Sequence, residues 1–118
     1  MKVTLITTCF NRAATIGRTI ESVLGQDYPD IEYIVVDGAS SDGSLEVIRR
    51  YQGIAQIVSE PDNGMYEAIN KGLRMATGDL VGLVHSDDVL YDSHTVTAVV
   101  EAIMRSGADL LYGDGLYM

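Results

Sequence analysis

Short apolar runs alternate with segments of helical periodicity along almost the whole chain. The apolar runs have the length and the Val and Ile content of strands buried on both faces, and they lie at residues 3–6, 33–36, 57–58, 80–84 and 109–112. Between them, apolar residues recur three and four positions apart, as on one face of a helix. These residues are Ile16, Ile20, Val23 and Leu24, then Leu45 and Ile48, then Met65, Ile69 and Leu73, and finally Val96, Val99, Val100 and Ile103. Few folds satisfy this alternation, because parallel strands need a helical crossover between them.

The alternation predicts an α/β fold, a Rossmann-like parallel sheet with helices on both faces. Residues 1–118 contain no linker, repeat or low-complexity tract, so we expect a single domain. A net charge of −9 argues against a nucleic-acid partner, because phosphate backbones favour basic surfaces. The single cysteine, Cys9, allows no internal disulfide, and no signal peptide or membrane span is evident, so we expect a cytoplasmic chain.

Polar residues follow the expected strands, at the edge where α/β sheets bind ligands. Thr8 and Asn11 follow the first strand, Asp37 follows the second, and Asp87 and Asp88 follow the fourth. Adjacent carboxylates repel each other unless they share a cation such as Mg²⁺ or Mn²⁺ with a phosphate-bearing substrate. The alternative is a solvated acidic turn that caps the next helix. The chain has neither the glycine-rich dinucleotide motif nor the P-loop motif, so a nicotinamide, flavin or P-loop nucleotide site is not expected.

Several short motifs, taken in order, resemble a known family. They lie at residues 7–12, which include a T-x-[FY]-N turn, and at residues 22–26, 34–43, 70–72, 76–80 and 86–88. Each motif alone is common, but their order and spacing resemble the family 2 glycosyltransferases of the GT-A fold, from Val3 to about Asp114. The resemblance implies transfer, with inversion, of a sugar from a nucleotide diphosphate donor to an acceptor in polysaccharide or glycoconjugate biosynthesis. A UDP-sugar is the favoured donor, and a GDP-sugar is the second candidate.

The resemblance also implies roles for the residues at the strand ends. Thr8 and Asn11 would belong to the nucleotide site, with Thr8 beside the base or the ribose, and Asp37 would hydrogen-bond the nucleoside. Successive residues of an extended segment point to opposite sides. We therefore expect Asp88 to bind Mn²⁺ or Mg²⁺, and Asp87 to hydrogen-bond the ribose or the donor sugar.

One motif departs from the family pattern. Gly38 follows Asp37 where the family often has a second aspartate, as in D-D-G-S. If that second aspartate normally contacts the base, the contact is lost here or is made by another residue. The stretch at 60–70 resembles a variant found in transferases that build bacterial surface polysaccharides. Its turn either borders the donor pocket or, as the favoured interpretation, is only a tight turn followed by a helix cap.

An inverting transferase needs a general base within hydrogen-bond reach of the acceptor hydroxyl. In the family this carboxylate lies later in the chain than the acidic motif. We therefore expect it beyond Met118, and Asp114 is only a weak candidate. His85 is expected to pack at a strand end and His94 to lie in the first turn of a helix, so neither suits the role.

These features predict an N-terminal donor-binding part of a longer enzyme, truncated at its C-terminus and unable to turn over alone. We expect a saccharide or lipid-linked acceptor, a place in the cytoplasm or at the inner face of the membrane, and self-association through uncovered sheet near residue 118. Two alternatives stay open. A receiver-like signalling domain has a similar length and βα alternation, but it carries its acidic pair after the first strand, where this chain has Thr7 and Thr8. A binding module that keeps the nucleotide pocket without catalysis is the other.

Overall fold

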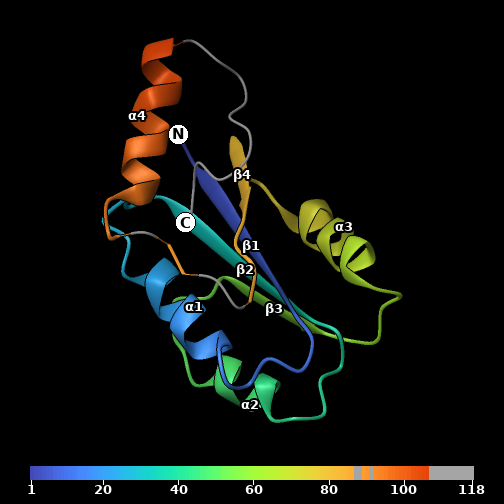
Figure 1. Cartoon of the computed structure of the whole chain (residues 1–118). Helices are drawn as coiled ribbons and strands as arrows, with labels where there is room; N and C mark the ends of the chain where they lie inside the picture. Colours follow the sequence, from blue (N-terminus) through green and yellow to red (C-terminus); the bar gives the residue numbers. More distant parts are fainter. Residues whose placement is uncertain (87–88, 91, 107–118) are drawn as a thin grey trace.

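The computed structural model describes residues 1–86, 89–90 and 92–106 as a parallel sheet with helices (Figure 1). The elements, in chain order, are β1 (Val3–Cys9), α1 (Ile16–Leu24), β2 (Ile31–Asp37), α2 (Ser44–Arg49), β3 (Gln56–Ser59), α3 (Met65–Met75), β4 (Leu80–Leu83) and α4 (Thr95–Ser106). The strand predicted at residues 109–112 lies outside the described residues. Among the described helices, none has the length and the hydrophobicity needed to cross a bilayer.

The sheet has the strand order β3-β2-β1-β4, and every pairing is parallel. β1 lies in the centre, with Cys9 in register with Asp37 of β2 and Ile6 in register with Leu83 of β4. Asp37 is in turn in register with Ser59 of β3. The carboxyl ends of the strands therefore meet at one edge, and residues far apart in the sequence become neighbours there.

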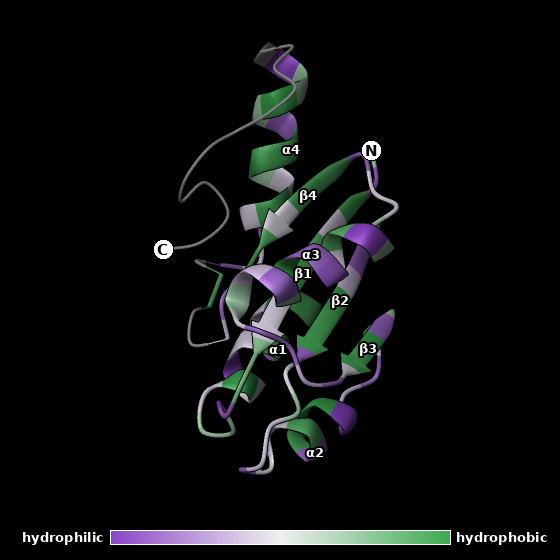
Figure 2. Cartoon of the chain, turned by 90° about the vertical axis from the view of Figure 1, so that its right-hand side faces the viewer, coloured by the Kyte–Doolittle hydropathy of each residue, from purple (hydrophilic) through white to green (hydrophobic). Residues whose placement is uncertain are grey.

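Helices cover both faces of the sheet, as the sequence predicts. Alternate strand residues point to opposite faces. Leu5 and Tyr33 pack in the larger core cluster with residues of α1, α2 and α4, whereas Ile6 and Ile34 pack on the other face with Ala68 of α3. Strands covered on both faces are apolar along most of their length, which Figure 2 shows for β2 and β4.

A glycine lets α3 approach the sheet closely. A Cβ atom at Gly72 would lie 2.6 Å from Cγ2 of Ile6, well inside contact distance. Any larger residue at this position would push α3 away from β1. The first turn of α3 borders the site described below, so this close contact also helps to position that site.

Candidate functional site

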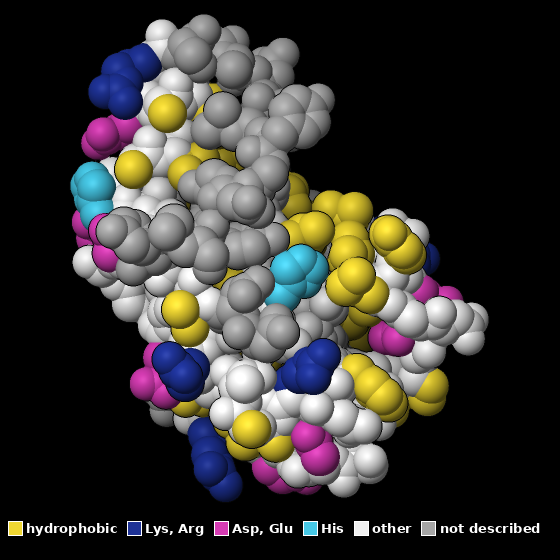
Figure 3. All heavy atoms as spheres, in the orientation of Figure 1, with side chains coloured by type: hydrophobic (Ala, Val, Ile, Leu, Met, Phe, Trp, Pro, Cys, Tyr) yellow, Lys and Arg dark blue, Asp and Glu magenta, His cyan; other side chains and the backbone are white. Residues whose placement is uncertain are grey.

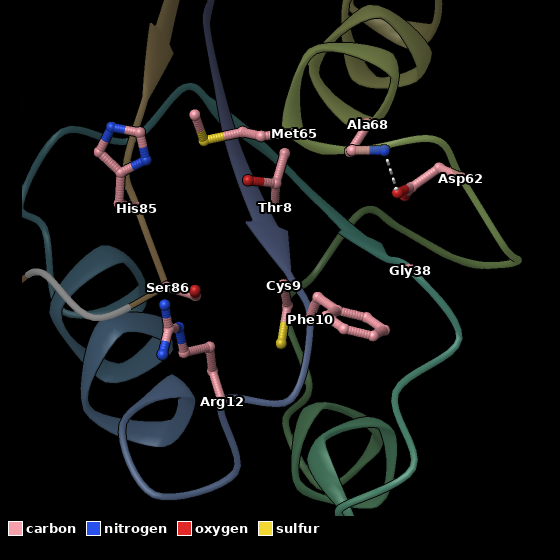
Figure 4. Close-up of a pocket in the computed structure, with 11 residues that line it drawn as sticks. Thr8, Cys9, Phe10, Arg12, Gly38, Asp62, Met65, Ala68, His85 and Ser86 are labelled. Carbon is pink, nitrogen blue, oxygen red and sulfur yellow. Dashed lines mark hydrogen bonds between the residues drawn. The ribbon is translucent and has the colours of Figure 1, made fainter.

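A cavity of about 550 Å³ opens at the carboxyl edge of the sheet. Its walls come from the ends of β1 and β4, the residue after β2, the first turn of α3 and the turn that precedes α3. The lining residues are Thr8, Cys9, Phe10, Arg12, Gly38, Asp62, Gly64, Met65, Ala68, His85 and Ser86 (Figure 4). This is the edge where open α/β sheets bind their ligands.

Thr8 faces the cavity because side chains alternate along β1. Its neighbour Thr7 is fully buried and shares a 2.8 Å hydrogen bond with the hydroxyl of Tyr33. Thr8 points the other way, is partly exposed and lines the cavity. The structure thus brings Thr8 to the site, and its contact with a nucleotide stays a prediction.

Asp37 is fully buried, and its carboxylate is engaged by the protein itself. Oδ2 accepts hydrogen bonds from the Ser40 backbone N–H at 3.0 Å and from the Ser59 hydroxyl at 2.9 Å. Oδ1 accepts one from the Ser40 hydroxyl at 2.5 Å. Charge-assisted bonds of this kind are among the stronger ones in proteins. In the structure Asp37 therefore holds the loop after β2 to the end of β3, and it is not among the residues that line the cavity. Its bond to a nucleoside stays a prediction.

Asn11 also joins two loops. Its φ of 54° places it in the left-handed region, which asparagine adopts more readily than most residues. Its Oδ1 accepts a 2.9 Å hydrogen bond from the Ser41 backbone N–H, and its own N–H donates to the Ser40 hydroxyl at 2.8 Å. The loop after β1 and the loop after β2 are thereby held together beside the cavity. The predicted role of Asn11 in nucleotide binding stays a prediction.

The acidic pair Asp87 and Asp88 lies outside the described residues, as does Asp114, so the structure describes none of the three. The residues on either side of the pair are nevertheless anchored on α1. The backbone carbonyl of Ser86 accepts hydrogen bonds from the hydroxyls of Thr15 at 2.9 Å and Thr19 at 3.1 Å. Ser86, which directly precedes Asp87 in the sequence, lines the cavity.

The far side of the same segment is anchored by two more side chains. The Ser22 hydroxyl accepts a 3.1 Å hydrogen bond from the Leu90 backbone N–H. Gln26, just after α1, donates from Nε2 to the Asp92 carbonyl at 2.6 Å and accepts at Oε1 from the Val96 N–H at 3.0 Å. The motif at residues 22–26 therefore has a physical role, which is to fix the segment around the acidic pair and the start of α4.

The cavity lining also includes Phe10, Arg12 and Asp62. The sequence analysis did not predict these three as site residues. The Phe10 side chain is 61% exposed, which is unusual for a large aromatic group and leaves its ring accessible to a ligand. In Figure 4 the Arg12 guanidinium extends toward Ser86, on the side of the view opposite Asp62. Phe10 and Arg12 belong to the same motif as Thr8, and this was the available signal for them. Asp62 belongs to the 60–70 stretch, whose turn does border the cavity.

Three other titratable groups lie in or near the cavity wall, and their surroundings differ. Burial is the main cause that raises the pKa of the Cys9 thiol, so the thiol stays protonated at neutral pH and forms part of the wall. His85 lies in the cavity wall just beyond the end of β4. His94 lies directly before α4, and its Nδ1 is 2.8 Å from Oδ2 of Asp27, so its ring is engaged outside the cavity lining.

The arrangement agrees with comparisons to known proteins. The protein-family model described as Glycosyl transferase family 2 matches residues 4–117 of the sequence. The chain belongs to this family. A curated family relative from Mycobacterium tuberculosis, an uncharacterized glycosyltransferase, is 38% identical over 117 residues, which make up 97% of this chain and 45% of the relative. The chain thus spans a little under half the length of this relative.

Two solved structures share the fold. The mannosyltransferase PcManGT from Pyrobaculum calidifontis, in complex with GDP-Man and Mn²⁺, is 32% identical and has a TM-score of 0.80, over 86% of this chain and 32% of that one. TarS 1-349 from S. aureus, in complex with UDP-GlcNAc, is 26% identical and has a TM-score of 0.82, over 89% of this chain and 32% of that one. The predicted GT-A nucleotide-binding fold is confirmed, and the receiver-like alternative is ruled out.

Proposed function

We propose that this family 2 chain is the donor-binding part of an inverting glycosyltransferase that uses a nucleotide diphosphate sugar. One observation carries the proposal: the cavity at the carboxyl edge has an exposed aromatic ring, Phe10, and a cation, Arg12, within one wall. An aromatic ring offers a stacking surface to a nucleobase, and a guanidinium offers several N–H donors to a diphosphate. Complexes of two structural relatives with GDP-Man and with UDP-GlcNAc support the same class of ligand.

The negative net charge of the chain strengthens the argument that Arg12 binds the diphosphate. At −9 the protein as a whole repels anions, so binding of a diphosphate needs local positive charge. Arg12 is exposed, and its backbone N–H is held by the Ser44 hydroxyl at 2.8 Å, which fixes the loop that carries the guanidinium. Thr8, on the adjoining part of the wall, would contact the ribose or the base.

A divalent cation would supply the rest of the positive charge. Within residues 1–86, 89–90 and 92–106, no group of three or more His, Cys, Asp or Glu side chains is arranged to hold a metal. Mg²⁺ and Mn²⁺ are often bound by only one or two carboxylates together with substrate phosphates. The cavity fits such a site because Ser86 lies in its wall and leads directly into Asp87 and Asp88. On the alternation of side chains along an extended segment, we propose Asp88 as the metal ligand and Asp87 as the partner of the ribose or the donor sugar. A bound cation would neutralise negative charge that develops on the departing diphosphate.

We assign no general base among the described residues, and Asp114, the weak candidate within this chain, lies outside them. We propose a saccharide or lipid-linked acceptor, made into polysaccharide or glycoconjugate at the cytoplasmic side of the membrane. By itself the chain would bind the donor and not transfer the sugar, and self-association through its C-terminal part is part of the same proposal. A binding module without catalysis is the second candidate, because the proposed contacts of Phe10, Arg12 and Thr8 with the ligand serve binding.

Isothermal titration calorimetry tests the proposal with UDP and GDP, each with and without Mn²⁺. We expect one diphosphate to bind in a metal-dependent manner, and its nucleotide sugar to compete for the same site. Arg12→Gln removes the cation and should weaken binding by about tenfold, since a charge-assisted hydrogen bond contributes about 1.5–3 kcal/mol and this one is partly exposed to water.

Arg18→Gln is the matched control, because Arg18 is an exposed arginine of α1 that does not line the cavity. Circular dichroism should show both variants folded. If neither diphosphate binds at millimolar concentration, or if Arg12→Gln and Arg18→Gln bind equally well, the proposed site is wrong. Transfer of the sugar to an added acceptor, measured by product formation, separates a transferase from a binding module.

A further inference from the structure

Gly38 and Asp62 meet in the cavity wall, although they are far apart in the sequence. A Cβ atom at Gly38 would lie 3.1 Å from Oδ2 and 3.3 Å from Oδ1 of Asp62. These distances are tighter than ordinary van der Waals contact, so a side chain at position 38 would force the Asp62 carboxylate to shift by a few tenths of an ångström. The carboxylate of Asp62 thus occupies the space that a side chain at the end of β2 would otherwise fill.

One hydrogen bond holds the Asp62 carboxylate, and two others hold the turn that carries it. Its Oδ1 accepts a 3.2 Å hydrogen bond from the Gly64 backbone N–H, and the positive φ of Gly64, 121°, makes this tight turn possible. Upstream, the Glu60 N–H donates to the Asp37 carbonyl at 3.0 Å, which ties the start of the turn to the end of β2. On the other side, Nζ of Lys71 in α3 donates to the Pro61 carbonyl at 3.2 Å. The group is therefore positioned before any ligand arrives.

Asp62 and Arg12 divide the cavity into two ends of opposite charge. Figure 4 shows them on opposite sides of the view, with Phe10 and Cys9 between them. A diphosphate is repelled by a carboxylate and attracted by a guanidinium, so its charge belongs at the Arg12 end. An elongated ligand held by its diphosphate there would place its other end, the base, near Asp62 and Gly38, beside the Phe10 ring.

An ionised carboxylate offers only acceptors. Among the described residues, none donates a hydrogen bond to Oδ2 of Asp62. The side chain is only partly exposed, so a base packed against it must supply the missing donor. Uracil presents N3–H, and guanine presents N1–H and its amino group. Cytosine and adenine instead present an amino group beside an unprotonated ring nitrogen, so a carboxylate placed opposite the ring nitrogen would meet its lone pair.

We propose that Asp62 hydrogen-bonds the edge of the base and favours nucleotides whose base carries a ring N–H, such as uridine and guanosine diphosphates, over those whose ring nitrogen is unprotonated. The inference rests on the proposed function and adds a specificity-determining residue to it. Gly38 contributes to the same specificity, because the absence of a side chain at this position leaves room for the Asp62 carboxylate.

Calorimetric titration of the chain with UDP, GDP, CDP and ADP at one fixed Mn²⁺ concentration tests this. We expect UDP or GDP to bind at least tenfold more tightly than CDP and ADP. Asp62→Asn preserves the turn, since asparagine forms the same side-chain turn, but it places an amide donor in the cavity. This variant should bind the preferred nucleotide about tenfold more weakly and should bind CDP more tightly than the unmodified chain does.

Two further variants complete the experiment. The backbone at Gly38 accepts an alanine, because Gly38 is not in the left-handed region. The new methyl group of Gly38→Ala should displace the Asp62 carboxylate and weaken binding of the preferred nucleotide in the same way. Asp30→Asn is the control, since Asp30 is exposed and lies just before the opposite end of β2. It should leave all four affinities unchanged.

The outcomes separate the two proposals. If the unmodified chain binds all four diphosphates equally, or if Asp62→Asn weakens all four by the same factor, Asp62 contacts the sugar or only supports the turn, and the inference is wrong. If no nucleotide binds the unmodified chain, the proposed function itself fails, whatever the variants do.

Discussion

Gln26 provides a direct test of how α1 positions the segment around the acidic pair. It lies just after α1, where its Nε2 donates to the Asp92 carbonyl at 2.6 Å and its Oε1 accepts from the Val96 N–H at 3.0 Å. Val96 is in the first turn of α4, where backbone N–H groups have no partner within the helix. Gln26 thus caps α4 from another part of the chain. Gln26→Met keeps the length of the side chain and removes all of its hydrogen bonds.

The expected loss follows from these contacts. Removing a cap from a helix N-terminus costs about 0.5–2 kcal/mol, and losing the bond to the exposed Asp92 carbonyl adds at most about 1 kcal/mol, because water replaces it. We therefore expect the free energy of unfolding to fall by about 1–3 kcal/mol. For a chain of 118 residues, this corresponds to a fall in melting temperature of roughly 4 °C for each kcal/mol.

Urea denaturation followed by circular dichroism measures the change, with Gln52→Met as the control at an exposed glutamine in the segment after α2. Gln26→Met should also weaken Mn²⁺-dependent nucleotide binding, because it loosens Asp92 and the start of α4, which follow Asp87 and Asp88 closely in the sequence, without removing a ligand contact. Binding measured in the presence of EDTA should change much less. Equal stability of Gln26→Met and Gln52→Met would refute the capping argument. An unchanged metal-dependent affinity would refute the link between the cap and the acidic pair.

Two other perturbations test the core and the surface. Tyr33→Phe leaves the buried Thr7 hydroxyl without its 2.8 Å partner and should lower the free energy of unfolding, measured by urea denaturation, by about 1–3 kcal/mol. Thr7→Val should lower this free energy less in the Tyr33→Phe background than in the unmodified chain. An equal loss in both backgrounds would disprove the coupling. Hydrogen bonds from Thr97 and His94 lower the pKa of Asp27, and the bond to Asp27 raises the pKa of His94. The stabilisation by His94 is therefore complete below its ordinary pKa and is lost as the pH rises through its raised value, while that by Asp27 is lost as the pH falls through its lowered value. His94→Gln should flatten the decline of stability as the pH rises above the ordinary histidine pKa, and an unchanged pH profile would show that the pair contributes nothing.

Much of the architecture could be predicted from local patterns. The runs at 3–6, 33–36 and 80–84 became β1, β2 and β4, because strands covered on both faces must be apolar throughout. The helical periodicities became α1 to α4 for a similar reason, since each helix needs one apolar face. The edge that carries the site also followed, because parallel strands bring their carboxyl ends together.

Which polar side chains face the cavity and which are engaged by the protein itself could not be predicted in the same way. Asp37 and Thr8 both lie at strand ends, yet one is enclosed by Ser40 and Ser59 and the other faces the cavity. The difference arises from partners supplied by other loops, and sequence position alone does not reveal which loop will cover which strand end.

The sequence by itself determined the α/β alternation, the family and the edge of the sheet where a ligand would bind, because these depend on hydrophobic periodicity and on the order of short motifs. Only the tertiary structure decided which groups line the cavity. It brought Asp62 into the space left open by Gly38, and it placed Gln26 at the start of α4. These contacts join residues more than twenty positions apart, so they arise from the register of the sheet and the packing of the helices, which no local pattern encodes.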